Sequence, residues 1–407
     1  MMVNIYRCLT ELIGLLLPLA GIFVRKGKTA EFIKGRLRGM PAGTLPKNGH
    51  RYWFHCASLG EFEQARPLIE RLKAAKTSNS IVITFFSPSG YRQRFDYELA
   101  DAVLYLPLDT PSNARKLQNY IQADTAVFIK YELWYFHLKE LHKRGIPVFL
   151  VSAVFREKQF LFSFLGKWLF GLLKAYKHIF VQDTNSLELL QKKEVSNVSL
   201  SGDTRFDRVK QNALNVKINE RISRFKSDKK LLVLGSSWQP EEDILAELLE
   251  ADRLADIKIM IAPHDISEMH IEELLKKFNA WSATRYTGTE ETDNPRILIL
   301  DTIGHLASAY VYSDIALIGG GFGKGLHNIL EALAFGVPVC FGPGVEKYPE
   351  AAWAREAGVA AVINNSEELA VLVQKWLDEE HETLKVKCTD FIHCHAGASD
   401  LILKSML

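Results

Sequence analysis

A chain of 407 residues is long enough for two or three domains with substantial cores. Its 47% hydrophobic and 24% charged residues are typical of globular proteins, which excludes a largely disordered chain, a collagen-like repeat and a polytopic membrane protein. The formal charge is +2, but residues 1–40 hold seven basic and two acidic side chains, so the positive charge is concentrated at the N-terminus and no nucleic-acid partner is expected. Five irregularly spaced cysteines predict no disulfide framework and a reducing, cytoplasmic compartment.

The N-terminus carries an uncharged apolar run at 12–24, which is shorter than the ~20 residues of a membrane-spanning helix. A cleavable signal peptide would place its charges before the run, whereas here they follow it and no cleavage site is apparent. This order predicts a membrane anchor whose charged end stays at the anionic cytoplasmic face; the alternative is a buried N-terminal helix. The basic residues after the run are Arg25, Lys26, Lys28, Lys34, Arg36 and Arg38.

The first half of the chain alternates short apolar runs with amphipathic segments. Such a pattern indicates a parallel sheet covered by helices on both faces, and helices are expected over 61–75 and 133–144. A further helix is expected over 160–177, where one narrow polar stripe indicates either a buried helix or one lying in a lipid surface. The expected strands are 52–58, 81–86, 102–108, 125–129, 147–153, 178–183 and 198–203.

The second half repeats this pattern, with strands expected at 231–237, 257–263, 296–301, 314–321, 337–343 and 359–363. Two Rossmann-like halves predict a cleft between them, with ligands bound beyond the C-terminal ends of the strands. The expected division is an N-terminal anchor (1–40), a first Rossmann-like domain (41–207), a charged linker (208–229), a second Rossmann-like domain (230–385) and a C-terminal helix (386–407), for which packing back on the first domain is one option.

A glycine-rich segment at 319–325 follows an expected strand and precedes the pattern LHNILEALAFG. It is not a P-loop, because Gly325 stands where Ser or Thr is required, and no register gives G-x-G-x-x-G. Glycines still permit a tight turn, and free amides at a helix start can face a phosphate. We expect Asn328 and Glu331 on the first turn of a helix, where the carboxylate would accept hydrogen bonds from sugar hydroxyls; a turn without a ligand is the alternative.

Three charged residues follow strands of the first half. Glu61, in HCASLGE, either complements the dipole of the helix that it opens or acts as a general base on an acceptor hydroxyl. Glu132 in YELW and Arg205 in GDTRFD occupy similar positions, for which a structural ion pair is the alternative.

The C-terminal segment CTDFIHCHAG is rich in residue types that bind metals, but its spacing fits neither a zinc knuckle nor HExxH, and we expect no metal site. The residues concerned are Cys388, His393, Cys394 and His395. A G-x-S-x-G nucleophile elbow is also missing from the sequence.

Seven motifs stand in the order found in the 3-deoxy-D-manno-octulosonic acid (Kdo) transferases of lipopolysaccharide synthesis, which the chain resembles up to about residue 380. They are HCASLGEFEQARPL, YELW, GDTRFD, LGSSWQPEED, the AP-H at 262–264, DTIGHLASAYVYSDIALIGGG and HNILEALAFGVPVCFGP. The resemblance implies a two-domain GT-B glycosyltransferase, anchored at the inner membrane with its body in the cytoplasm. It also implies metal-independent transfer of Kdo from CMP-Kdo to a hydroxyl of lipid IVA, the lipid A precursor.

The resemblance assigns roles to individual residues. It implies that Glu61 is the general base, that Ser58 and Gly60 lie at the acceptor, and that Glu132 and Arg205 support the transition state. Its CMP contacts fall on Pro263, His264, Gly304, His305, Leu306, Asn328, Ile329, Leu330 and Glu331.

Several positions depart from the pattern of the family. Lys130-Tyr131-Glu132-Leu133-Trp134-Tyr135-Phe136 replaces E-T-E-L-W-P-N, and the usual Arg and Glu of two CMP motifs are His264 and His305. A histidine meets a phosphate more weakly than arginine does, and in a pH-dependent manner. Two alternatives therefore stay open: a GT-B enzyme of another specificity, such as a lipid-linked N-acetylglucosaminyltransferase or a sugar-nucleotide epimerase, and a non-catalytic membrane-bound binder of lipid or nucleotide.

Overall fold

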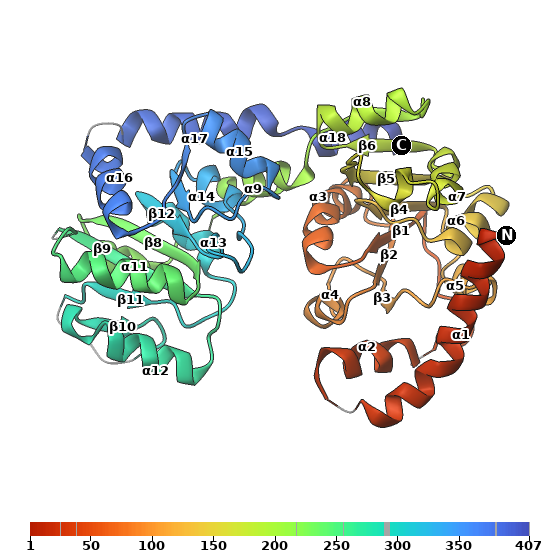
Figure 1. Cartoon of the computed structure of the whole chain (residues 1–407), viewed down its shortest axis with the longest axis horizontal. Helices are drawn as coiled ribbons and strands as arrows, with labels where there is room; N and C mark the ends of the chain where they lie inside the picture. Colours follow the sequence, from red (N-terminus) through yellow and green to blue (C-terminus); the bar gives the residue numbers. More distant parts are fainter. Residues whose placement is uncertain are drawn as a thin grey trace. The chain divides into compact units, whose positions relative to one another are not determined.

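The computed structural model describes residues 1–24, 26–37, 39–216, 218–254, 256–288, 294–378 and 381–406. The chain forms two compact units (Figure 1). Unit 1 comprises Met1–Arg208 and Gly397–Leu407, and unit 2 comprises Val209–Ala396.

Unit 1 is built on a seven-stranded parallel sheet of order β3-β2-β1-β4-β5-β6-β7. Successive side chains of a strand point to opposite faces, and both faces are buried. One face packs against α3 and α18, and the other against α5, α6 and α8. The strands are β1 (Arg51–Cys56), β2 (Ser80–Phe85), β3 (Ala102–Tyr105), β4 (Thr125–Ile129), β5 (Val148–Ala153), β6 (His178–Val181) and β7 (Val198–Leu200). The helices are α1 (Met2–Phe23), α2 (Gly27–Leu37), α3 (Leu59–Ala75), α4 (Pro88–Arg94), α5 (Pro111–Ile121), α6 (Tyr135–Lys143), α7 (Lys167–Phe170), α8 (Thr184–Lys192) and α18 (Ala398–Met406), and α9 (Thr204–Leu214) runs from unit 1 into unit 2.

Unit 2 repeats the architecture, with a seven-stranded parallel sheet of order β10-β11-β9-β8-β12-β13-β14. Leucine and isoleucine side chains of β8, β9, β11 and β12 form one core with α11, α12 and α16. The strands are β8 (Lys230–Ser237), β9 (Ile257–Pro263), β10 (Ala283–Arg285), β11 (Ile297–Ile299), β12 (Ile315–Ile318), β13 (Val339–Phe341) and β14 (Ala360–Val362). The helices are α10 (Glu220–Lys226), α11 (Gln239–Glu250), α12 (Glu268–Lys277), α13 (Leu306–Ala309), α14 (Leu330–Ala334), α15 (Pro349–Glu356), α16 (Ser366–Asp378) and α17 (His381–His395).

Each expected strand is present, although several are shorter than expected, and the short edge strand β10 was not anticipated. The helix expected over 160–177 is wrong: the segment consists of two 3-10 turns, Phe160–Phe162 and Gly171–Ala175, flanking the four-residue α7. A Cβ at Gly166 would lie 1.8 Å from the carbonyl oxygen of Phe160, so the chain folds back on itself there and cannot continue as one helix. The expected linker, 208–229, contains most of α9 and the whole of α10, whose Ile222 and Phe225 are buried.

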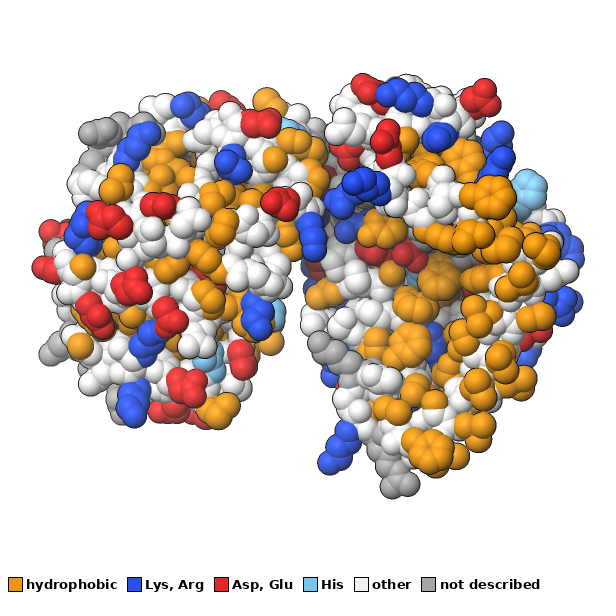
Figure 2. Space-filling view, viewed as in Figure 1, with side chains coloured by type: hydrophobic (Ala, Val, Ile, Leu, Met, Phe, Trp, Pro, Cys, Tyr) orange, Lys and Arg blue, Asp and Glu red, His pale blue; other side chains and the backbone are white. Residues whose placement is uncertain are grey.

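The N-terminal helix α1 begins ten residues before the uncharged run and reaches 22 residues. Its length and composition would allow it to cross a membrane. Of its residues only Thr10 and Leu17 are buried, which disfavours the alternative of a buried N-terminal helix. Apolar side chains gather on the exposed side of unit 1 that carries α1 (Figure 2). Arg25 and Arg38, two members of the expected basic run, lie outside the described residues.

The C-terminal region separates into two helices rather than the single helix expected over 386–407. α17 belongs to unit 2, whereas α18 returns to unit 1 and packs on α3. Asp207 fixes this return, because its two carboxylate oxygens accept the backbone N–H groups of Gly397 (2.6 Å) and Ser399 (2.7 Å). Ile402 and Met406 of α18 complete the core beneath α3.

Candidate active site

The order of the sheet locates the first candidate site. In unit 1 the chain starts at the interior strand β1, proceeds outward to β3 and returns to β4 on the other side of β1, so the strand order reverses between β1 and β4. Open parallel sheets bind ligands outside the carboxyl ends of the strands at such a reversal. Ser58, Gly60 and Glu61 follow β1, and Glu132 follows β4. The two predicted acids therefore flank the position at which a ligand is expected.

Glu61 lies in the first turn of α3, whose N-terminal cap is Ser58. Glu61 is 7% exposed, and its Oε2 accepts a hydrogen bond from the backbone N–H of Ala57. Burial, together with the negative charge of Glu132, raises the pKa of Glu61 to about 7. Among the described residues no Lys, Arg or His forms an ion pair with Glu61. A carboxylate with a pKa near neutrality is suited to accept a proton.

Glu132 belongs to a group of hydrogen-bonded side chains that lies at the carboxyl ends of β1 and β4. The Nε1–H of Trp134 donates to its Oε2 at 2.5 Å, and the buried His55 at the end of β1 places Nε2 at 3.3 Å from the same oxygen. The other ring nitrogen of His55 lies 2.9 Å from Thr84 Oγ1 on β2. Residues on or next to three neighbouring strands thus orient Glu132. His55 and Trp134 were not predicted as site residues from the sequence.

Lys130, one residue beyond β4, adopts φ = 67°, in the left-handed region that side chains other than glycine rarely enter. Its positive charge lowers the pKa of Glu61, in opposition to Glu132. Lys130 replaces the first Glu of the E-T-E-L-W motif, so in this chain Glu61 faces one neighbouring acid and one neighbouring base.

Arg205 forms an ion pair with its neighbour Asp203, a partner that the sequence did not suggest. Its Nε donates to Asp203 Oδ2 at 2.8 Å, and a second guanidinium nitrogen lies 2.7 Å from the same oxygen. This loop packs on α3, since Gln64 Nε2 donates to Asp203 Oδ1 at 3.3 Å and Thr204 Oγ1 donates to the carbonyl oxygen of Gln64 at 2.6 Å. Gln64 is one turn beyond Glu61, so these contacts place the loop of Arg205 near the start of α3.

The sheet of unit 2 reverses its order between β8 and β12, and two loops meet at this point. Glu241, in the first turn of α11, accepts the backbone N–H of Gly320 at 2.8 Å and that of Trp238 at 3.1 Å. The glycine-rich segment forms the second loop: Gly320 has φ = 89°, and a Cβ there would lie 2.1 Å from the carbonyl oxygen of Gly325. The glycines are therefore required by a tight turn, as expected.

A cluster of rings and one cation lies beside this turn. His264, exposed after β9, stacks on Trp238 with 4.4 Å between ring centroids, and His327 lies 4.8 Å from His264. Trp238 Nε1 donates to His327 Nε2 at 3.3 Å, and Lys324 Nζ lies 5.3 Å from the Trp238 ring. Flat rings with two imidazoles and an ammonium suit a base and a phosphate. The sequence analysis predicted His264 here and missed Trp238, Lys324 and His327.

The remaining predicted CMP contacts also follow strand ends of unit 2. Pro263 is the last residue of β9; Gly304, with φ = 91°, His305 and Leu306 come after β11, and His305 lies beside Tyr286 with 5.4 Å between rings. The expectation of a helix through Asn328 is wrong, because α14 begins only at Leu330. Asn328 and Glu331 are nevertheless together: Asn328 Nδ2 donates to Glu331 Oε1 at 3.1 Å.

The histidines and cysteines of the C-terminal tail belong to α17, where His395 stacks on Trp353 at 5.6 Å. Within the described residues no three His, Cys, Asp or Glu side chains are grouped as metal ligands.

Comparison with known proteins agrees with this architecture. The profile of the family described as "3-Deoxy-D-manno-octulosonic-acid transferase (kdotransferase)" matches residues 32–208. The 3-deoxy-D-manno-octulosonic acid transferase of Haemophilus influenzae is 28% identical over 316 residues, which cover 73% of this chain and 72% of the relative. The enzyme of the same name from Chlamydia muridarum is 26% identical over 366 residues, 84% of this chain and 81% of the relative.

Among solved structures, a UDP-GlcNAc 2-epimerase from Neisseria meningitidis superposes with a TM-score of 0.63 at 15% identity, covering 88% of this chain and 99% of the epimerase. MurG from Acinetobacter baumannii gives a TM-score of 0.54 at 13% identity, with 88% and 98% covered. At such identities these neighbours establish the fold alone, which is GT-B. The family profile over residues 32–208 and the curated relatives show that this chain is similar to the 3-deoxy-D-manno-octulosonic acid (Kdo) transferases over most of its length.

Proposed function

We propose that this chain transfers Kdo from CMP-Kdo to a hydroxyl of lipid IVA, at the cytoplasmic side of the inner membrane and without a metal ion. The single observation that supports this most is the buried Glu61, which stands at the reversal point of unit 1 with a pKa of about 7 and no ion-pair partner among the described residues. Such a group is half ionised at neutral pH, as a general base requires.

In the proposed step, Glu61 accepts the proton of the lipid hydroxyl, and the oxygen attacks the anomeric carbon of Kdo. The bond between that carbon and the phosphate oxygen breaks, and CMP leaves with its electron pair. Glu132, oriented by His55 and Trp134, and Arg205 support charge developing on the sugar. In unit 2, Lys324 offers positive charge to the CMP phosphate, His264 offers a ring nitrogen, and Trp238 offers a flat face.

The membrane assignment is supported by α1 and the charges that follow it. α1 exposes large apolar side chains along its length, among them Ile5, Leu9, Leu12 and Phe23. A hydrophobic segment followed by lysine and arginine favours retention of the charged end at the cytoplasmic surface. An enzyme whose acceptor is a lipid gains from such anchoring, because both reaction partners then share one surface.

The proposal is tested by incubating the purified full chain with detergent-solubilised lipid IVA and a panel of donors, and by mass spectrometry of the lipid. CMP-Kdo is expected to add one or more Kdo units, whereas UDP-sugars give no product. Transfer from a UDP-sugar would identify a GT-B enzyme of another specificity. CMP-Kdo binding without any product would identify a non-catalytic binder.

Restoring the family's arginine provides a second prediction. His264→Arg is expected to lower the KM for CMP-Kdo several-fold at pH 8, because a guanidinium keeps its charge and donates two parallel hydrogen bonds to a phosphate. Steady-state kinetics at fixed lipid measures the effect. His395→Arg, on α17 outside the ring cluster, is the matched control and should leave KM unchanged; a His264→Arg variant with unchanged or raised KM would remove His264 from the donor site.

A further inference from the structure

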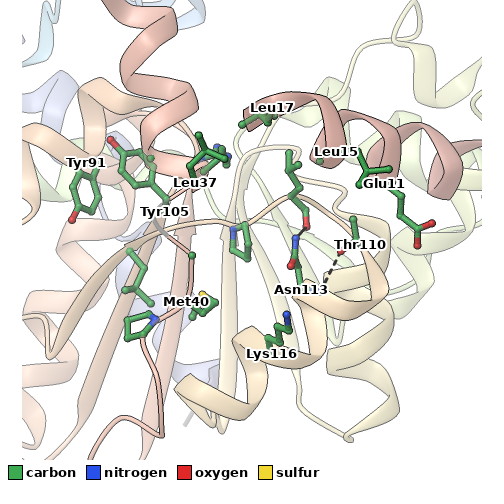
Figure 3. A pocket seen from close by; sticks show the side chains of 18 residues that line it. Glu11, Leu15, Leu17, Leu37, Met40, Tyr91, Tyr105, Thr110, Asn113 and Lys116 are labelled. Carbon is green, nitrogen blue, oxygen red and sulfur yellow. Dashed lines mark hydrogen bonds between the residues drawn. The ribbon is translucent and has the colours of Figure 1, made fainter. Parts of the chain in front are cut away.

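A pocket of about 710 Å³ lies in unit 1 beneath the N-terminal helices, well away in the sequence from the acids of the proposed active site. Leu15 and Leu17 of α1 line it across from Asn113 and Lys116 of α5, with Tyr91 and Tyr105 at one end (Figure 3). Pockets that bind small molecules span roughly 300–1,000 Å³ and are mostly apolar with few polar groups. This pocket has that size and composition, and none of the roles discussed above uses it.

Arg36 is the unusual member of its lining. Its guanidinium carbon lies 4.6 Å from the ring centroid of Phe32, 4.5 Å from that of Phe86 and 5.5 Å from that of Tyr105, and one nitrogen donates to the carbonyl oxygen of Phe86 at 2.7 Å. Its Nε and Nη1 are buried and have no hydrogen-bond partner among the described residues. Burial lowers the pKa of Arg36 to about 10, which still leaves it charged at neutral pH. A buried cation with unused donors calls for an anion.

A close glycine contact holds this arrangement. A Cβ at Gly35 would lie 2.7 Å from the ring of Tyr105, so only glycine lets α2 approach the end of β3 closely enough to place Arg36 among the three rings. The position of the guanidinium is thus fixed by the packing of α2 on the sheet.

A chain of contacts joins Arg36 to the acids. The Phe86 ring, which stacks under Arg36, lies 4.9 Å from the ring of Trp134, and Trp134 donates its Nε1–H to Glu132. Glu132 in turn acts electrostatically on Glu61. An anion at Arg36 would therefore be separated from the proposed general base only by a short series of packed side chains.

The remaining features of the pocket suit an amphiphile. Leu15 lines it and is 73% exposed, so the pocket opens to the surface beside the apolar side chains of α1. Of its charged lining residues, Glu11 is engaged by Arg7 at 2.8 Å, whereas Arg36 and Lys116 contribute positive charge. Apolar walls that open at a lipid-facing helix and carry a net positive charge complement an acyl chain attached to a phosphate.

We propose that this pocket holds an acyl chain of the lipid acceptor and that Arg36 binds the acceptor's phosphate, so that the reacting hydroxyl is presented to Glu61. The inference rests on the proposed function for the identity of the lipid. Arg36 is here a substrate-binding residue of unit 1, and the pocket would explain how a large lipid is held by a small domain.

Binding is tested first without any transfer. Dodecyl phosphate, below its micelle concentration, is titrated into the full chain by calorimetry, with inorganic phosphate and dodecyl phosphocholine as comparison probes. Dodecyl phosphate is expected to bind, and Arg36→Gln to weaken it about tenfold or more, since a charged hydrogen bond is lost. Arg92→Gln is the matched control, because Arg92 is an exposed arginine on α4 paired with Glu31. The proposal would be overturned if Arg36→Gln bound dodecyl phosphate as tightly as the unsubstituted chain does. It would also be overturned if the unsubstituted chain bound inorganic phosphate as tightly as dodecyl phosphate.

Kinetics then test the link to the acceptor. Arg36→Gln is expected to raise the KM for lipid IVA about tenfold while the KM for CMP-Kdo is unchanged. A second pair does not depend on the buried arginine: Leu15→Asp should raise the acceptor KM more than Leu16→Asp, since both leucines are exposed on α1 and only Leu15 lines the pocket. Equal effects of the two substitutions would reject the pocket as the acceptor site. If the chain transferred no Kdo at all, the binding experiment would still decide whether the pocket takes the amphiphile.

Discussion

Glu61→Gln is expected to lower kcat for Kdo transfer by roughly 10²- to 10⁴-fold, the usual contribution of a positioned general base. Glutamine has the same shape, and its carbonyl oxygen can still accept the N–H of Ala57, so the turn between β1 and α3 should be preserved. It cannot accept a proton at neutral pH. The measurement is initial rates with saturating donor and lipid, together with calorimetric titration of CMP, whose affinity should not change.

Glu63→Gln is the matched control on the same helix, since Glu63 is partly exposed and pairs with Arg94 at 3.0 Å. In the unsubstituted enzyme the rate should rise with pH up to about 7 and then level off, because the ionised form of Glu61 is the active one. Glu61→Gln should abolish this rise. Turnover close to that of the unsubstituted chain would remove Glu61 from the chemistry.

The same substitution should stabilise the fold at alkaline pH. The pKa of Glu61 is raised from 4.5 to about 7 in the folded chain, so the folded state binds this proton more tightly than the unfolded state does. Stability is therefore lost as the pH rises from about 4.5 to 7, and the loss amounts to about 3 kcal/mol above pH 7. Glutamine carries no charge and does not incur this loss.

Chemical denaturation at pH 5 and pH 8 measures the difference. We expect Glu61→Gln to exceed the unsubstituted chain in unfolding free energy at pH 8 and to approach it at pH 5, whereas Glu63→Gln should show no such pH dependence. A Glu61→Gln variant that is less stable at pH 8 would mean that the ionised carboxylate is favoured by its surroundings, contrary to its burial. Together the two predictions describe a site at which stability is given up for function.

The fold could be predicted from the sequence because the strands of a parallel sheet are buried on both faces. β4 and β12, for example, are uniformly buried, so their apolar runs are continuous and easily recognised. The residues of segment 160–177 are equally apolar, but its conformation depends on the close approach of Gly166 to the backbone of Phe160. The periodicity of the sequence does not reveal such a contact. Short elements such as β10 and α14 are set by packing with distant partners, and their three and five residues carry too little pattern.

Only part of the candidate site could be predicted from the sequence. The predicted residues follow the carboxyl ends of strands, which is where α/β folds bind their ligands; they are Glu61, Glu132 and His264. The groups that orient them come from elsewhere in the chain: His55 and Trp134 are 79 positions apart, and Trp238 and His327 are 89 apart. The roles of single residues came from the resemblance to a family. Arg36, which lines the pocket beneath α1, stood out in the sequence only as one of several basic residues.

The return of α18 to unit 1 has a consequence for biosynthesis. α3, which carries Glu61, is covered by Ile402 and Met406, and these residues leave the ribosome after every other part of both sheets. The domain that is synthesised first must therefore wait until α18 has been translated before its core is closed. A message that ended before α18 would release a protein with both sheets but with an uncovered apolar surface on α3, the helix that carries Glu61.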